Sequence, residues 1–201
     1  MTAAAVRDVL KPNPFKRQVF ARRGDGGKGE LYAAVGVALD RWERCQVRFA
    51  ELYRALAAPD DGGDVALRAF AFVNDANSKR LMLAEAAQAA FHDDADDDLV
   101  RRVQDALALH RDATLRRNEI AHAAVMREAR YKIVNGVTVA RTPFWYLVPA
   151  LTAVHADLFA DQRPRYRFAL RDVVRISEGF EQLGQEASLL AGAVQTLRDG
   201  G

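Results

Sequence analysis

Six consecutive residues, Arg117 to His122 (RNEIAH), carry the side chains of this sequence that are best suited to chemistry. Arg117 offers a permanent charge and a planar fork of donors that fits phosphate oxygens. His122 supplies an imidazole, and a histidine can both take and give a proton near neutral pH. Because Asn118 precedes His122 by four residues, the two share a helix face and the amide can orient the ring. The hexapeptide therefore predicts a site that binds a phosphate and moves a proton.

The spacing of Arg117 and His122 limits how the two side chains can meet. Five residues of α-helix correspond to a rotation of about 140° and a rise of about 7.5 Å, so the two flank one edge of the helix and do not stack. Either a long arginine reaching sideways or a second copy of the helix across a two-fold axis would bring both onto one phosphate. The spacing favours the second arrangement, a composite site at a homodimer seam.

The hexapeptide resembles the Arg-x4-His signature of HEPN domains, the higher-eukaryote and prokaryote nucleotide-binding superfamily. Asn118 matches the polar residue that commonly follows the arginine. Two long predicted helices before the motif, with Lys79 in the second, and a closing helix introduced by Tyr166-Arg167-Phe168 agree with this pattern. The resemblance is to stand-alone bacterial members and covers about residues 30–198. Ala123 departs from it, because glycine often follows the histidine in related sequences.

The resemblance implies a metal-independent endoribonuclease without a cofactor, acting as a homodimer and serving as a toxin or defence effector. By this resemblance, His122 would be the acid/base that assists attack by a ribose 2′-hydroxyl. Arg117 would bind the phosphate and stabilise its developing charge, and Asn118 would be a positioning residue. An RNA or nucleotide would be the ligand, with an antitoxin as a possible further protein partner. The weaker candidates for substrate contacts are Arg116, Glu119 and Lys79.

The alternative function is a non-catalytic HEPN-like helical module that binds nucleotide, RNA or a protein partner. Many members of this superfamily bind without cutting RNA. In that case Arg117 would be a structural ion-pair partner, for Glu85 or Glu119, and His122 a satisfied interface residue. A binding module would tolerate loss of His122, whereas a nuclease would not.

Hydrophobic residues at spacings of three and four predict the elements that must position this site. In the helix that carries the hexapeptide, the apolar stripe runs through Leu99, Val103 and His110 and continues to Arg117. The long helices are expected at about residues 30–57, 64–91, 96–129 and 170–197.

The segment between the last two predicted helices has a different pattern. Asn135-Gly136 lies between β-prone residues of 133–139, which predicts a type I′ hairpin. Residues 142–165 contain three prolines, with a short helix expected around 150–158. The predicted fold is therefore all-α, an up-and-down bundle of about four long helices with a small β-hairpin inserted before the last helix.

Composition and charge limit the remaining possibilities. The chain has 201 residues, of which 50% are apolar and 28% charged, as in a soluble globular domain. A formal charge of +2 does not by itself indicate a nucleic-acid binder. Residues 1–29 are rich in Lys, Arg, Pro and Gly, so we expect a basic arm that is mobile or packs on a partner subunit. Residues 30–198 would form the helical domain.

Several classes of protein are disfavoured by what the sequence offers. A single cysteine, Cys45, excludes an intramolecular disulfide and is expected to be buried. The four histidines do not show the spacing of a zinc site, so no metal is expected, and His110 is expected to be a hydrogen-bonded core residue. The longest apolar stretch is too short to span a bilayer and no secretion signal is apparent, which predicts a cytoplasmic protein without membrane association.

Overall fold

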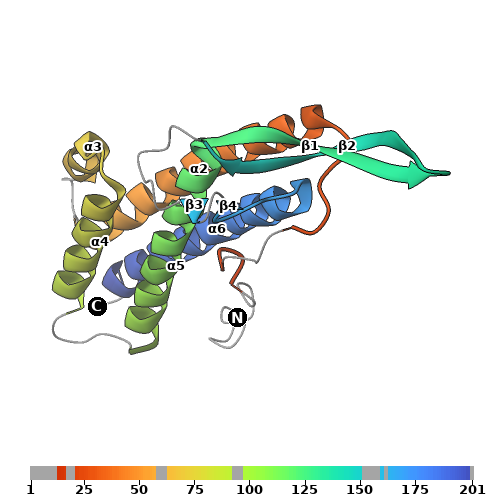
Figure 1. The fold of residues 1–201 in the computed structure, drawn as a ribbon. Coiled ribbons are helices and arrows are strands. Elements are labelled where there is room, and N and C mark those ends of the chain that lie inside the picture. The colour runs from red at the N-terminus through yellow and green to blue at the C-terminus, as the bar shows by residue number, and fades with distance from the viewer. Residues whose placement is uncertain are drawn as a thin grey trace.

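The computed structural model describes residues 13–16, 21–57, 63–91, 97–150, 159–160 and 163–199. These residues are mostly helical and include a long antiparallel hairpin before the last helix, as expected for the class (Figure 1). The elements are α2 (Lys28–Ala57), α3 (Gly63–Phe72), α4 (Ala76–Ala90), α5 (Asp97–Ala121), β1 (Ala123–Val134), β2 (Val137–Pro149), β3 (Phe159–Ala160), β4 (Arg163–Pro164) and α6 (Leu170–Asp199). None of the described helices combines the length and apolar character that a membrane span needs.

The two longest helices, α2 and α6, pack along each other and run in the same direction (Figure 1). At the first end, the Leu170 amide donates to the carboxylate of Asp25 at 2.7 Å, just before α2. At the other end, Arg198 donates to the carbonyl oxygens of Ala55 and Leu56. This parallel pair departs from the predicted up-and-down bundle. The reason is that β1 and β2 leave and return at the same end, so α6 starts where α2 starts.

Aromatic side chains form the centre of the core between α2, α5 and α6. The ring of Trp42 meets Phe180 edge-on with centroids 5.3 Å apart, and Trp42 and Phe49 both contact His110. Cys45 is buried, as predicted, and lies where α2 approaches Gly184 of α6. A Cβ atom at Gly184 would lie only 3.2 Å from the Cys45 Cα, so glycine permits this approach.

The second predicted helix is two helices in the structure. It is interrupted between α3 and α4, where Asp75 caps the start of α4 by accepting a hydrogen bond from the Ser78 amide at 2.6 Å. Asparagine and aspartate favour cap positions because their side chains satisfy free helix amides. The pair Asn74-Asp75 therefore starts a new helix, and the prediction of one continuous helix was wrong here.

The third predicted helix also ends early, at Ala121, and β1 begins two residues later. Residues of β1 that favour a helix locally are held in a strand by pairing with β2, from Ala123 opposite Pro149 to Val134 opposite Val137. Residues 142–149 belong to β2, although their sequence predicts no definite element. The predicted helix around 150–158 lies, except for residue 150, outside the described residues.

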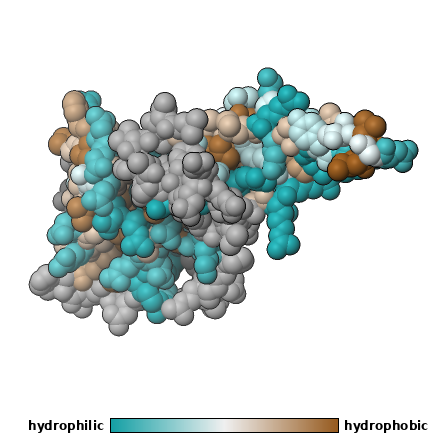
Figure 2. Space-filling model, viewed as in Figure 1, coloured by the Kyte–Doolittle hydropathy of each residue, from teal (hydrophilic) through white to brown (hydrophobic). Residues whose placement is uncertain are grey.

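The predicted turn at Asn135-Gly136 is confirmed, but the hairpin is much longer than expected. Asn135 and Gly136 have φ angles of 51° and 79°, the left-handed conformation that a type I′ turn requires at both central positions. The outer part of the hairpin projects from the helices into solvent (Figures 1 and 2). In Figure 2 its surface is mostly hydrophilic, with an apolar patch near the tip.

The base of the hairpin is covered on both faces. On one face, Val125 and Leu147 pack into the main core. The other face belongs to a second, smaller cluster of buried residues formed by Ala21, Tyr146, Val148 and Ala169. Short backbone bridges hold these layers together, because residue 25 pairs with Trp145 and residue 147 with Phe168.

A β-bulge separates the covered base of the hairpin from its exposed part. Glu128 pairs with Phe144 and Arg130 pairs with Arg141, so one residue of β1 opposes two residues of β2. Pro143 is one of the two residues of β2 in this bulge. Its missing amide hydrogen is tolerated there, because the bulge lies outside the regular hydrogen-bond ladder. Bulges of this kind bend a ribbon and increase its twist.

The described residues of the predicted N-terminal arm pack on their own chain. Phe15 is 1% exposed and stacks on Phe180 with ring centroids 5.5 Å apart. Asn13 donates to the carboxylate of Asp112 at 3.2 Å. Phe15 therefore attaches this segment to the aromatic core. Residues 1–12 and 17–20 of the predicted arm lie outside the described residues, so the arm as a whole stays a prediction.

We expect Phe15→Ala to lower the free energy of unfolding by about 3 kcal/mol, because it removes a buried aromatic ring and leaves a cavity. Urea denaturation followed by far-ultraviolet circular dichroism measures this change. Phe72→Ala is the matched control, since Phe72 is 88% exposed and its loss should change stability little. Equal effects of the two substitutions would contradict the packing described here.

Candidate functional site

The hexapeptide occupies the last turn of α5 and the junction with the hairpin. The His122 amide donates to the Asn118 carbonyl oxygen at 3.1 Å, so helical hydrogen bonding continues to His122. β1 begins at the next residue. Asn118 and His122 are exposed and Arg117 is half-buried. The structure thus places Asn118 and His122 one helical turn apart at the root of the hairpin, with Arg117 next to Asn118.

Arg117 is held only weakly by its neighbours. Its guanidinium donates to the Asn118 side-chain oxygen at 3.2 Å and lies 3.8 Å from the carboxylate of Glu43 on α2. The Glu43 side chain is 67% exposed, and an ion pair this long and this well solvated contributes little energy. The carboxylate partner is neither Glu85 nor Glu119, the two considered from the sequence. Arg117 can exchange this contact for an anionic ligand at low cost.

Arg116, rather than Arg117, lies on the buried side of α5. It forms an ion pair with Glu119, and the two side chains are only 9% and 15% exposed. The hydroxyl of Tyr166 donates to the Glu119 carbonyl oxygen at 3.0 Å. These contacts attach the end of α5 to the segment before α6. Arg116 and Glu119, considered as substrate contacts from the sequence, have little surface left for a ligand.

Lys79 lies on α4, and its contacts are with Phe70 and His110 rather than with the hexapeptide. Its ammonium nitrogen is 5.2 Å from the centroid of the Phe70 ring. Together with Arg80, it lies close enough to His110 to act on that ring electrostatically. The structure therefore groups Lys79 with the core histidine and not with Arg117 or His122.

His110 is a core residue, as predicted. The amide nitrogen of Gln46 and Nε2 of His110 are 2.8 Å apart, a hydrogen-bond distance. Burial lowers the pKa of His110 to about 4, and the positive charges of Arg80 and Lys79 act in the same direction. The ring is therefore neutral at physiological pH and serves packing rather than proton transfer.

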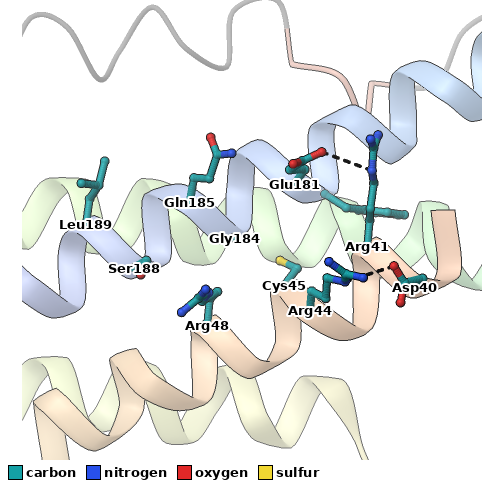
Figure 3. A pocket seen from close by; sticks show the side chains of 11 residues that line it. Asp40, Arg41, Arg44, Cys45, Arg48, Glu181, Gly184, Gln185, Ser188 and Leu189 are labelled. Atoms are coloured by element: carbon teal, nitrogen blue, oxygen red, sulfur yellow. Dashed lines mark ion pairs between the residues drawn. The ribbon is translucent and has the colours of Figure 1, made fainter. Parts of the chain in front are cut away.

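A groove of about 780 Å³ lies between α2 and α6 (Figure 3). Its arginines already have carboxylate partners: Arg41 lies 3.2 Å from Glu181 and Arg44 lies 3.1 Å from Asp40. Burial raises the pKa of the Cys45 thiol at its floor to about 12, so this thiol is not a nucleophile. The groove offers paired charges and no reactive group.

No metal site is apparent in the described part of the chain. There, no three His, Cys, Asp or Glu side chains come together in a group that could hold an ion. The exposed residues Asn118 and His122, with the half-buried Arg117 beside them, remain the strongest candidates for chemistry.

Comparison with protein-family models, with curated proteins and with solved structures finds no match for this chain.

Sequence reasoning missed one group of polar residues, the cations of the hairpin. The apolar spacing predicts residues 123–129 as part of the preceding helix, which separates Arg127 from the other cations. The available signal was the alternation of Arg130 and Lys132 with the apolar residues Ala129, Tyr131 and Ile133 along β1. The group consists of Arg127, Arg130, Lys132 and Arg141.

We expect the protein to lose stability between about pH 6.5 and pH 4 through His110. A histidine in the unfolded chain binds a proton near pH 6.5, while the folded protein resists protonation of His110 until about pH 4. Stability from this residue is therefore present above pH 6.5 and lost as the pH falls, by about 2 to 3 kcal/mol at pH 4.5.

Urea denaturation at pH 7 and pH 4.5 tests this expectation against His110→Phe, which cannot titrate. The variant should lose less stability on acidification than the parent, by the stated amount. An equal loss in both proteins would contradict the assignment.

Proposed function

We propose that this protein is a metal-independent endoribonuclease of the HEPN type. The observation that carries the proposal is an exposed His122 one helical turn from Asn118, beside an Arg117 whose only carboxylate contact in the described chain is long and solvated. A nuclease of this kind needs a proton acceptor and a phosphate-binding cation that are both open to RNA. The resemblance of the hexapeptide to the HEPN signature adds a reason for RNA as the substrate.

The chemistry follows from these side chains. His122 takes the proton of a ribose 2′-hydroxyl, whose oxygen attacks the adjacent phosphorus atom. The bond from phosphorus to the 5′ oxygen of the next nucleotide breaks, and that oxygen takes a proton from water. Arg117 binds the non-bridging phosphate oxygens as negative charge develops on them. The products carry a 2′,3′-cyclic phosphate and a 5′-hydroxyl.

A homodimer with composite sites is part of the proposal. Arg117 and His122 are five positions apart in the helix, which supports a site that takes the arginine from one copy and the histidine from the other. The resemblance further suggests a cytoplasmic toxin or defence effector, controlled by an antitoxin or another protein partner.

We expect the protein to cleave a mixed RNA pool in excess chelator and to leave cyclic phosphate ends. His122→Ala should reduce the rate at least 100-fold, because general acid–base catalysis contributes roughly that much or more. Gel analysis measures the cleavage rate, and mass spectrometry identifies the ends of the RNA products. Equal cleavage by parent and variant would point to a contaminant. No cleavage by either, with both folded, would favour the binding module.

Mixing two inactive variants tests whether the site is composite. In a mixed dimer of Arg117→Ala with His122→Ala, one of the two sites would combine an intact arginine with an intact histidine. After subunit exchange, activity should recover to about a quarter of the parent rate. Each variant treated alone is the control. No recovery, with exchange verified by differently tagged copies, would place both residues of a site on one chain.

A further inference from the structure

The hairpin β1–β2 concentrates positive charge. Between Ala123 and Pro149 it carries four cations, Arg127, Arg130, Lys132 and Arg141, against one carboxylate, Glu128. The resulting net charge of +3 exceeds the +2 of the whole chain, so the rest of the protein is close to neutral. The carboxylate of Glu128 already forms an ion pair outside the hairpin, 3.1 Å from the guanidinium of Arg167.

Three of these cations share one face of the exposed part of the hairpin. Arg130 and Arg141 are directly opposite each other across the strands, and Lys132 lies two residues further along β1 on the same face. Like charges in directly opposite positions destabilise a ribbon. In the described part of the chain, none of the three has a carboxylate within ion-pair distance. The opposed positive charges therefore do not stabilise the hairpin, whereas they would bind a polyanion.

Aromatic rings lie among the cations. The guanidinium of Arg130 is 4.0 Å from the centroid of Phe144, and that of Arg23 lies 5.7 Å from the same ring. Further out, Tyr131 is 66% exposed and lies on the opposite face of β1 from Arg130 and Lys132, its neighbours in the sequence. Planar guanidinium groups and exposed rings are the surfaces on which unpaired bases stack, while cations follow the phosphates.

The position of the hairpin relates this surface to the candidate site. His122 immediately precedes β1, and a strand rises roughly 3.4 Å per residue, so Arg130 lies about 27 Å from His122 along the ribbon. Cations are present from Arg127 outward and at the base, where Lys28 lies 5.8 Å from the ring of Trp145. An RNA strand bound along the hairpin would therefore reach the end of α5, where His122 lies.

We propose that the β1–β2 hairpin is a binding arm for single-stranded RNA, which it guides to His122. The choice of RNA as the polyanion rests on the proposed function. The apolar residues near the tip, Ile133 and Val137, are 76% and 63% exposed and suggest a protein contact as the competing role. Three clustered cations without carboxylate partners favour RNA over that role.

The experiment measures binding separately from cleavage. Fluorescence anisotropy follows a labelled 20-nucleotide single-stranded RNA in excess chelator, with every protein carrying His122→Ala so that the probe stays intact. One variant adds Arg130→Gln, Lys132→Gln and Arg141→Gln. The matched control adds Arg44→Gln, Arg48→Gln and Arg101→Gln, which removes the same charge from exposed positions on α2 and α5.

We expect the hairpin variant to raise Kd at least about 10-fold and to reduce the slope of log Kd against log salt by about 2, as for three lost phosphate contacts on a single strand. The control should raise Kd less than about 3-fold. Because Arg130 also stacks on Phe144, a variant with only Lys132→Gln and Arg141→Gln repeats the test without disturbing that contact. It should show a smaller loss in the same direction.

The outcomes separate this inference from the proposed function. Loss of binding in the hairpin variant supports the arm even if the parent protein cleaves no RNA. Equal binding by the hairpin and control variants would overturn the inference that the hairpin binds RNA. It would not contradict the proposed nuclease, provided that cleavage requires His122. Absence of binding by every protein also overturns the arm. Dimer dissociation on Ile133→Ser and Val137→Ser, measured by sedimentation, would then assign the hairpin to a protein contact.

Discussion

A two-stranded ribbon is not stable by itself in water, so this structure depends on the layers that cover the base of β1 and β2. Leu147 faces the helical core, and Tyr146 faces a second cluster on the opposite side. Asp25 serves both layers, because its backbone pairs with Trp145 and its carboxylate accepts the Leu170 amide at the start of α6. The N-terminal segment, the hairpin and the two longest helices therefore meet at one place.

The candidate site is attached to this same place. α5 passes into β1 at His122 without a loop, and the ion pair of Arg116 with Glu119, together with the Tyr166 hydroxyl, holds the helix end from within. The inward contacts come from other residues, and Asn118 and His122 remain exposed. A rigid, buried support beneath exposed polar groups is the arrangement that precise positioning of a substrate requires.

Elements with strong local signals were predictable, and those decided by distant contacts were not. Apolar spacing located α2 and α6 within two residues at each end, and Asn135-Gly136 located the turn. Residues 123–129 contain good helix formers, and only pairing with 144–149 makes them a strand. Asn118 and His122 of the predicted hexapeptide are exposed, but a helical count could not tell which arginine is buried. The buried one is Arg116, and the helix end that carries it is held by Tyr166, 47 residues beyond Glu119 in the sequence.

The bulge opposite Ala129 has a consequence for the direction of the hairpin. The type I′ turn sets the pairing of the outer strands, and the core sets the pairing at the base, so the additional residue of β2 is absorbed between them. Removing Thr142 would leave every cross-strand pair in place and yet straighten the ribbon at that point. The angle at which the hairpin leaves the helices is thus encoded by the length of one strand rather than by any side chain.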